Sequence, residues 1–427
     1  MSVTAFFDAD TVERRSDFFT GADQPPCTTG CPSQVDARGY INLISEGKFY
    51  EAIVLEKERN PLALCHGRLC NHQCEYSCTK GTEEGEPISI RLLKRFIADH
   101  EMTIPQEKRI PWVKPISKRK KIALIGSGPA CLTAGDDLMN LGYDVVIFES
   151  RSVPGGYLYV GIPDYRLPKG VLMDEINGIF GKGVDIRLST AIGKDIPFED
   201  LRKDGYAAVM IGTGAQKPLG LGIPGDDLPG VVAGEDFIEE VCMRRSPPIG
   251  KRVAVIGAGN TGMDACRSAL RQGAEEVYVL YRRTRKEMPA APDEVEDAIE
   301  EGVRFEYLVS PIRVVGDGKV EGIELVKNKL GDPDDSGRRS PVPVQGSEYI
   351  LPVDTILTAI SRVPDFPWIP KEIKVNRKKG IEVDWKTGMT SIPGVFAGGD
   401  CVLGAASAIE AVAHGKRAAR GIDQFLS

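Results

Sequence analysis

Two short glycine-rich turns constrain the fold of this 427-residue chain more than any other feature. The first, at residues 126–128, follows the apolar run Ile122–Ile125, and the second, at residues 257–259, follows a similar run that begins after Lys251. Each turn leads into a stretch whose apolar residues recur at helical spacing. A strand, a glycine turn and a helix in this order form the unit that binds the pyrophosphate of a dinucleotide. Two such units predict an α/β chain with two Rossmann-like domains and two nucleotide sites.

The first unit ends in an acid. Gly126 and Gly128 allow a tight turn and a close approach of phosphate, and the helix that begins at Pro129 and Ala130 offers its free N–H groups. The second strand is followed by Glu149, 21 residues after Gly128, where a carboxylate can bind the two ribose hydroxyl groups. These residues predict a site for a dinucleotide without a 2′-phosphate.

One position of the first unit departs from the usual pattern, because Cys131 stands where a third glycine is common. That glycine serves close helix–strand packing, and we expect a small thiol to fit with a slight displacement. Taken alone, the stretch is also compatible with an ordinary strand–helix–strand unit that binds nothing.

The second unit ends in basic residues. Its turn and the start of its helix carry Gly257, Gly259, Asn260, Thr261 and Gly262. The strand Val277–Leu280 is followed by Arg282 and Arg283, with Arg285 close by. Guanidinium groups bind a 2′-phosphate bidentately, whereas an acid would repel it, so this site is predicted to take NADP(H). Solvated surface arginines are the alternative interpretation.

The first site is then expected to hold FAD, and the C-terminal segment supports this. A strand ends at Gly399 and Asp400, where the carboxylate can accept a hydrogen bond from a ribityl hydroxyl group. The helix expected from about Ser407 would aim its positive end at the flavin. For Asp400 alone, a helix cap is the alternative. We also assign Gly156, Arg166, Gly214 and Ala408 to the nucleotide sites.

Six of the ten cysteines lie before residue 79, which indicates a local metal site rather than disulfides. The candidate ligands are Cys27, Cys31, Cys70, Cys74 and Cys78. A cubane iron–sulfur cluster needs four ligands, most often thiolates, and would give the flavin a one-electron partner. Zinc stays an alternative because His66 and His72 lie nearby.

Composition excludes some classes of protein. No apolar run approaches the length of a membrane span, and residues 1–15 lack the apolar segment of a signal peptide, so a cytoplasmic location is expected. A net charge of −7 argues against nucleic acid as the main partner. The expected domains are a helical iron–sulfur region with a basic linker (1–118), an FAD domain (119–246 and 365–427) and an NAD(P)H domain (247–364).

The chain resembles the small subunit of NADPH-dependent glutamate synthase and its relatives. These relatives include the N-terminal part of dihydropyrimidine dehydrogenase and the larger subunit of electron-bifurcating NADH-dependent ferredoxin:NADP oxidoreductase. The likeness runs from about Pro26 to Leu426. It rests on CTTGCP, GRLCNHQCEYSC, EEGEPISI, VPGGYLYVGIPDYRLPK, GNTGMDACRSALRQGAEEVYVLYRRTRKEMPA and GVFAGGDCVLGAASAIEAV.

The resemblance implies FAD, NADPH and two [4Fe-4S] clusters in a helical N-terminal domain. By motif position, Cys31, Cys70 and Cys74 match ligands of one cluster, and Cys27 and Cys78 match ligands of the other. The chain departs from the family at two points. A CxxC pair is absent upstream of Cys27, where the sequence is SDFFTGADQPP, and Lys94 falls at the position of a Gln or Glu ligand. One cluster held by four of the five cysteines is therefore favoured, and a second cluster completed by other ligands stays open.

The predicted function is an exchange of hydride between NADP(H) and FAD, with single electrons relayed through a cluster to or from a partner subunit. No side chain is needed as an acid or base, and the protein positions the rings. An electron-bifurcating, transhydrogenase-type complex is one setting. A glutamate synthase small subunit and a non-catalytic nucleotide-binding redox scaffold are the alternatives. No glutamine amidotransferase or pyrimidine-reducing segment is found, so the final substrate is expected on another polypeptide.

Overall fold

The computed structural model describes residues 24–105, 108–109, 112–334 and 337–427. The predictions on residues 1–15 and most of the SDFFTGADQPP stretch lie outside the described residues. Within residues 24–105 every regular element is helical, as the sequence predicts. The helices are α2 (Pro26–Thr29), α3 (Ala37–Ser45), α4 (Phe49–Lys57), α5 (Ala63–Leu69), α6 (Gln73–Tyr76), α7 (Thr79–Glu84) and α8 (Ile90–Thr103).

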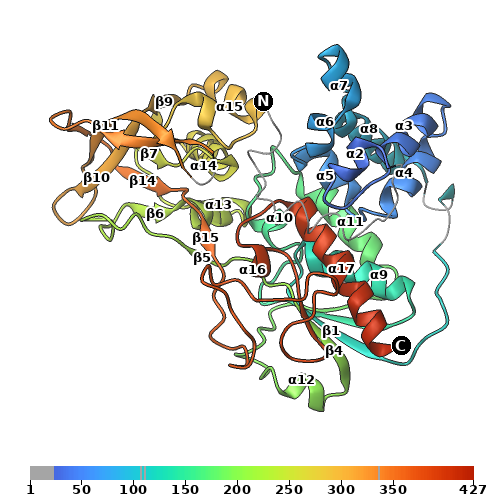
Figure 1. Ribbon diagram of the computed structural model, residues 1–427. Helices are drawn as coiled ribbons and strands as arrows, with labels where there is room; N and C mark the ends of the chain where they lie inside the picture. The colour runs from blue at the N-terminus through green and yellow to red at the C-terminus, as the bar shows by residue number, and fades with distance from the viewer. Residues whose placement is uncertain (1–23, 106–107, 110–111, 335–336) are drawn as a thin grey trace.

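The first nucleotide-binding domain is built on a parallel sheet in the order β16-β4-β1-β2-β3. Its strands are β1 (Lys121–Ile125), β2 (Asp144–Phe148), β3 (Asp185–Arg187), β4 (Tyr206–Ile211) and β16 (Val395–Ala397). Its helices are α9 (Pro129–Asn140), α10 (Tyr157–Val160), α11 (Lys169–Phe180), α12 (Asp200–Lys203), α16 (Asp400–Leu403) and α17 (Ala408–Leu426). The last helix, α17, lies beside α9 (Figure 1). The chain segments before and after the second domain therefore form the first domain together.

The second nucleotide-binding domain has a parallel sheet in the order β6-β14-β7-β8-β9. Its strands are β6 (Val231–Ala233), β7 (Arg252–Ile256), β8 (Glu276–Tyr281), β9 (Arg304–Tyr307) and β14 (Thr355–Thr358). The helical elements are α13 (Gly234–Cys242), α14 (Asn260–Arg271), the 3-10 turn η3 (Arg285–Glu287) and α15 (Pro292–Glu300). An antiparallel sheet of β10 (Val309–Val315), β11 (Gly322–Pro333), β12 (Arg339–Pro343) and β13 (Tyr349–Leu351) packs beside it.

The observed strand pairing places the start of the second domain earlier in the chain than the sequence predicts. The sequence places the second domain at 247–364, but β6 pairs with β14 and α13 follows β6 directly, so this sheet already begins at Val231. A three-residue strand between glycine- and proline-rich stretches carries too little periodicity to be seen in the sequence. The chain passes between the two domains at β5 (Lys217–Pro218) and β15 (Arg362–Val363), which pair antiparallel.

The helical N-terminal domain is docked onto the first nucleotide-binding domain. Leu62 and Cys65, at the start of α5, are fully buried in the same hydrophobic core as β1, α9 and α17. The carboxylate of Glu175 on α11 accepts hydrogen bonds from the backbone of Leu64 (2.5 Å) and Cys65 (2.9 Å). An acid at the N-terminus of a helix is the favourable arrangement. Among the described residues, no helix has the length and apolar character that a membrane span requires.

Candidate functional site

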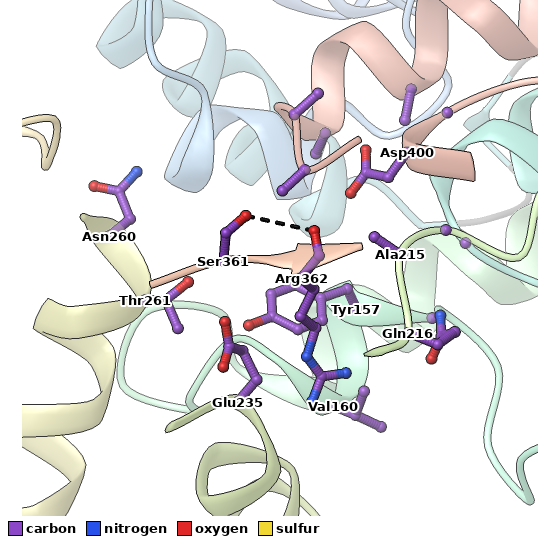
Figure 2. A pocket seen from close by; sticks show the side chains of 18 of the residues that line it. Tyr157, Val160, Ala215, Gln216, Glu235, Asn260, Thr261, Ser361, Arg362 and Asp400 are labelled. Atoms are coloured by element: carbon purple, nitrogen blue, oxygen red, sulfur yellow. Dashed lines mark hydrogen bonds between the residues drawn. The ribbon is translucent and has the colours of Figure 1, made fainter. Parts of the chain in front are cut away.

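A cleft of about 1410 Å³ lies between the two nucleotide-binding domains, and residues of the N-terminal domain close one part of it. Figure 2 shows Asp400, Gln216 and Tyr157 of the first domain and Asn260 and Thr261 of the second around the same hollow. The predicted nucleotide-site residues that line the cleft are Gly126, Gly128, Pro129, Ala130, Glu149, Gly156, Arg166, Gly214, Gly257, Gly259, Asn260, Thr261, Arg282, Arg283, Gly399, Asp400 and Ala408. Gly262 and Arg285 are not part of its lining.

The first glycine turn has the geometry that a diphosphate requires. Gly126 has φ +100°, and a Cβ there would lie 2.7 Å from the carbonyl oxygen of Gly212. Gly128 precedes α9, and a Cβ on it would meet no atom within 4 Å, so its side of the turn faces open space. No side chain caps α9, which leaves its first N–H groups available. These features fit the pyrophosphate of a dinucleotide such as FAD.

The structure explains how Cys131 replaces the third glycine. Cys131 is fully buried, and its thiol contacts the carbonyl oxygen of Ile125 at 3.6 Å. Across the contact stands Gly212, where a Cβ would lie 2.4 Å from the Cys131 sulfur. The absence of a side chain at Gly212, just after β4, therefore makes room for the thiol of Cys131. Close helix–strand packing is kept although the glycine pattern is broken.

Glu149 stands at the end of β2, where the sequence places it, but its carboxylate is already engaged. One oxygen accepts hydrogen bonds from the backbone (2.9 Å) and hydroxyl (2.6 Å) of Ser127. The other accepts from the backbone of Arg151 (2.8 Å) and the hydroxyl of Ser150 (3.2 Å). Glu149 therefore braces the glycine turn as well as lining the cleft. An ionised carboxylate has further lone pairs for a ribose.

The second glycine turn repeats the first with a conventional pattern. Gly257 has φ +122°, and a Cβ there would lie 2.2 Å from the carbonyl oxygen of Ala359. A Cβ on Gly262 would lie 2.3 Å from the carbonyl oxygen of Gly257, so this glycine serves helix–turn packing, which explains why it does not line the cleft. Gly259 leaves the start of α14 open, since a Cβ on it would meet only Pro289, at 3.8 Å.

The three arginines predicted at the second site have different surroundings. Arg282 is exposed and lines the cleft. Arg283 also borders the cleft, but its side chain is 2% exposed, pairs with Asp334 and donates to the carbonyl oxygen of Arg339. Arg285 pairs with Glu296 away from the cleft. Only Arg282 of the three therefore presents a guanidinium to a ligand without first breaking an ion pair. Arg338, which the sequence analysis missed, lines the same part of the cleft.

Asp400 and α17 meet at the flavin side of the cleft. Gly399 has φ +77°, and the following α16 begins at Asp400. Burial raises the pKa of the Asp400 carboxyl to about 7, although a backbone contact from Ala406 lowers it. Ser407 caps α17 in a capping box with Glu410, so the helix begins at Ala408, one residue after the start predicted at about Ser407. The positive end of α17 therefore faces the cleft beside a carboxyl group.

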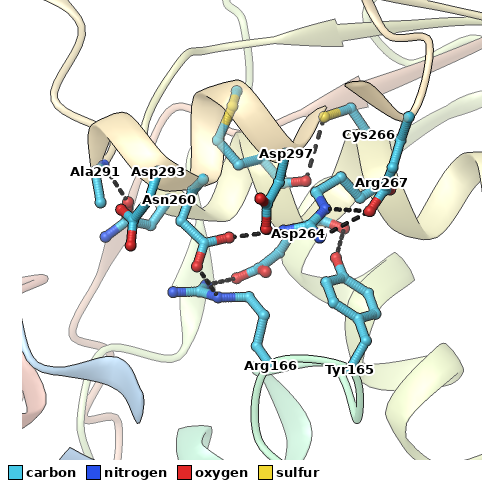
Figure 3. A network of polar contacts seen from close by, with 12 residues as sticks. Tyr165, Arg166, Asn260, Asp264, Cys266, Arg267, Ala291, Asp293 and Asp297 are labelled. Carbon is cyan, nitrogen blue, oxygen red and sulfur yellow. Dashed lines mark hydrogen bonds and ion pairs between the residues drawn. The ribbon is translucent and has the colours of Figure 1, made fainter. Parts of the chain in front are cut away.

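Arg166 belongs to an ionic network that joins the two nucleotide-binding domains (Figure 3). Its guanidinium contacts Asp264 at 2.6 Å and Glu294 at 2.7 Å, and its side chain is 9% exposed. Glu294 also pairs with Arg267, which lies over the ring of Tyr165. The sequence assigns Arg166 to a cofactor, and Arg166 does line the cleft, while its charge is compensated by carboxylates on α14 and α15 of the second domain.

Three residues in the middle of the cleft escaped the sequence analysis. Glu235 is 4% exposed, and one of its carboxylate oxygens has no hydrogen-bond partner among the described residues. Arg362, from the other side, pairs with Asp236. Tyr157 lies close to Thr261 of the opposite domain, and burial raises the pKa of its phenol. Glu235 and Arg362 closely follow β6 and β14, and the carboxyl ends of parallel strands are where ligands bind, which is the signal that could have found them.

The predicted metal ligands gather at a second, smaller cavity in the N-terminal domain. Cys27, Cys31, Cys70 and Cys74 line it together with Lys94, whereas Cys78 does not. Burial raises the pKa of the thiols of Cys31 and Cys74, and bound metal would displace those protons. The cavity is only about 20 Å³, so a cubane would require the thiol groups to turn outward.

The donor set fits a cluster better than a single ion. Among the residues that the structure describes, no three His, Cys, Asp or Glu side chains are arranged to hold one metal ion. Four ligands of one zinc ion stand close together, whereas each iron of a cubane takes its own thiolate. His66 and His72 are not among the residues that line the thiol cavity, so neither joins the cysteines there as a zinc ligand.

Comparison with known proteins agrees with this geometry. Residues 120–415 match the model of the pyridine nucleotide-disulphide oxidoreductase family, and residues 7–105 match that of dihydropyrimidine dehydrogenase domain II, 4Fe-4S cluster. The glutamate synthase [NADPH] small chain of Escherichia coli is 34% identical over 98% of this chain and 92% of its own length. The chain belongs to the glutamate synthase small-chain family. The resemblance predicted from the motifs is thereby confirmed, as is the fold class.

Other members of the family are more similar in sequence but longer. The NADP(+)-dependent formate dehydrogenase subunit beta of Moorella thermoacetica is 44% identical, and the match spans 94% of this chain and 60% of that protein. The NADPH-Fe(3+) oxidoreductase subunit beta of Geobacter sulfurreducens is 39% identical over 94% of this chain and 63% of its own length. The chain thus spans less than two thirds of these two relatives.

Solved structures support the fold alone. FprA from Mycobacterium tuberculosis in complex with NADPH has a TM-score of 0.62 at 20% identity, over 72% of this chain and 84% of that one. Thioredoxin reductase of Thermoplasma acidophilum (T. acidophilum) has a TM-score of 0.55 at 20% identity, over 72% and 100%. In this chain, the region that matches the 4Fe-4S cluster domain precedes the region that matches the pyridine nucleotide-disulphide oxidoreductase family.

Proposed function

We propose that the chain exchanges electrons between NADP(H) and a partner subunit, with FAD at the first glycine turn and one [4Fe-4S] cluster at the thiol cavity. When bound, FAD would supply hydride exchange with the nicotinamide and one-electron exchange with a cluster. The protein's own part is positioning. Gly128 and the start of α9 hold one diphosphate, and Gly259 and the start of α14 hold the other.

The contact between the two cavities carries this proposal. Cys70 and Ile409 line both the large cleft and the thiol cavity. A cluster ligated by Cys70 would therefore stand directly behind the wall of the flavin site, beside the first turn of α17. Zinc or an unreacted thiol at this place could not exchange electrons with the flavin. An iron–sulfur cluster could, because it carries single electrons.

NADP(H) is proposed for the second site because of Arg282. Its guanidinium is exposed at the cleft just after β8, where the edge of the adenosine ribose is expected. Charge-assisted bonds to a 2′-phosphate give a preference that NADH cannot match. Arg338 is proposed as a second contact. Arg283 is proposed to hold the strand end rather than the phosphate, since its own partner is Asp334.

The partner is proposed to be another redox subunit, and the relatives give two candidates. Similarity to a formate dehydrogenase subunit beta favours a catalytic subunit that exchanges electrons with a small substrate. In a bifurcating, transhydrogenase-type complex the partner would instead exchange electrons with a second carrier. The match to the E. coli glutamate synthase small chain along 92% of its length favours a glutamine-dependent partner. A cytoplasmic location remains our expectation.

The deciding experiment is anaerobic purification with the native partners, followed by native mass spectrometry, metal and sulfide analysis, and reduction by NADPH. We expect FAD, four irons with four sulfides per chain, bleaching of the flavin by NADPH and a co-purifying redox subunit. A chain that binds NADPH but never bleaches its flavin would be a non-catalytic scaffold. Stoichiometric zinc without iron would overturn the cluster.

A further inference from the structure

Lys94 occupies an unusual place for a lysine. It lies on α8, is 7% exposed, and lines the cavity formed by Cys27, Cys31, Cys70 and Cys74. Long charged side chains are rarely buried unless an opposite charge accompanies them. The protein groups that can provide one are the cavity thiolates and Glu56, which is fully buried on α4.

The charge on Lys94 is stabilised by those neighbours. Glu56 is buried on α4, which packs against α8, and each cavity thiol would become a negatively charged thiolate on binding iron. Glu56 is in turn fixed by Asn60, whose amide donates to it at 2.6 Å. An ammonium group has three donors and no lone pair, so it can donate to sulfur but cannot ligate iron.

The cavity nevertheless offers four thiols. Cys31 and Cys74 are half-buried and line the cavity with Lys94, Cys70 follows the last residue of α5, and Cys27 lies on α2. Cys78, the remaining candidate, lies at the N-terminus of α7. Cys78 does not line the cavity.

We propose that Cys27, Cys31, Cys70 and Cys74 hold a single [4Fe-4S] cluster, and that Lys94 stands beside it as an uncoordinated cation that raises its reduction potential. The assignment rests on the proposed function, in that it requires a cluster. Cys27 thereby supplies the fourth ligand that position 94 cannot give. A fixed positive charge stabilises the more negative, reduced cluster, and poor screening in a buried site strengthens the effect.

The ligand set is tested by two matched variants, Cys27→Ala and Cys78→Ala, purified anaerobically as full-length protein. We expect Cys27→Ala to lose the EPR signal of the reduced cluster and most of its iron and sulfide. Cys78→Ala should keep four irons per chain. FAD content is the folding control, because the flavin site lies in another domain.

The charge is tested by EPR-monitored redox titration of Lys94→Met and Lys94→Arg. In Lys94→Met we expect the ratio of reduced to oxidised cluster at a fixed potential to fall about tenfold, which for one electron equals about 59 mV toward more negative potential. Lys94→Arg keeps the charge and should stay within about threefold of wild type. The iron content of both variants should be unchanged.

Other outcomes overturn the inference and separate it from the proposed function. If Cys78→Ala loses the cluster while Cys27→Ala retains it, the ligand set is wrong although the redox function stands. Eight irons in the wild type, with about four lost in each cysteine variant, would mean two clusters. An unchanged potential in Lys94→Met, or loss of iron in that variant alone, would remove the electrostatic role. Wild-type protein without iron would fail the proposed function itself.

Discussion

The turn at Gly126 and the turn at Gly257 bend the backbone in the same way, with φ of +100° and +122°, and each leads into an uncapped helix. Beyond the backbone they differ. The first turn is braced by Glu149, whose carboxylate is bonded to Ser127, and is packed through Cys131. The second leaves the guanidinium of Arg282 exposed at the cleft.

This difference separates two tasks that a dinucleotide motif combines. Glycines and a free helix start suffice to receive a diphosphate, and both turns have them. The choice of nucleotide rests on the residue that follows the second strand and on whether its side chain is already paired. Glu149 is an acid with several partners, Arg282 is a base that faces the cleft, and Arg283, one residue further, is taken up by Asp334. Four sets of substitutions test this difference between the two units.

The largest effect is expected at the Cys131 contact, where the two units differ in packing. Gly212→Ala would place a Cβ 2.4 Å from the Cys131 sulfur, so we expect overpacking of about 3 kcal/mol and release of FAD at lower denaturant. Adding Cys131→Gly should recover most of this loss, apart from about 1 kcal/mol for a glycine in a helix. The measurement is denaturant-induced unfolding followed by flavin fluorescence.

The control for that substitution is Gly178→Ala on α11, because a Cβ there meets no atom within 4 Å. It should leave stability unchanged or slightly raised. If Gly212→Ala behaved like this control, the compensation between Cys131 and Gly212 would be refuted.

The second effect concerns nucleotide choice at the basic end of the second unit. Arg282→Ala should lower kcat/KM for flavin reduction by NADPH about 30-fold, which corresponds to about 2 kcal/mol, and should leave the value for NADH nearly unchanged. Arg285→Ala is the matched control, since Arg285 pairs with Glu296 outside the cleft. Equal use of NADH and NADPH by the wild type would count against the assignment.

The third effect distinguishes Arg283 from its neighbour. Arg283→Ala should destabilise the second domain by about 1–2 kcal/mol, because it removes a buried guanidinium from Asp334 and from the carbonyl oxygen of Arg339. Most of the preference for NADPH should remain. Thermal unfolding and kcat/KM ratios for the two nucleotides, measured on the same preparation, would show the split. A variant that unfolds like wild type but has lost its preference would reverse the roles of the two arginines.

The last effect is a pH dependence of stability on the flavin side of the cleft, where Asp400 can titrate. Burial holds the pKa of Asp400 at about 7, above its value of about 3.9 in an unfolded chain. Between these two pH values the folded state keeps a proton that the unfolded state releases, so stability falls as pH rises through this window. Asp400→Asn should remove that fall in flavin-free protein, and parallel stability curves for variant and wild type would contradict it.

Features of the fold and site that depend on neighbouring residues could be predicted from the sequence, and features that depend on contacts between distant residues could not. Strands, turns and helices of both units, and the helix start at Ala408, depend on local patterns and were predicted to within a few residues. The burial of Arg283 depends on Asp334, and the packing of Cys131 depends on Gly212, both distant in sequence. The same holds for Arg166, whose partners lie on α14 and α15. Spacing alone carries no information about such pairs.

The paired crossing of β5 and β15 has a mechanical consequence. The chain leaves the first domain through Lys217–Pro218 and returns through Arg362–Val363, and the two segments are hydrogen-bonded to each other. Two strands tied side by side behave as a flat strap, which bends across its thin direction and resists torsion. We therefore expect the paired segments to limit rotation of the second domain relative to the first, which would keep the nicotinamide on the same face of the flavin.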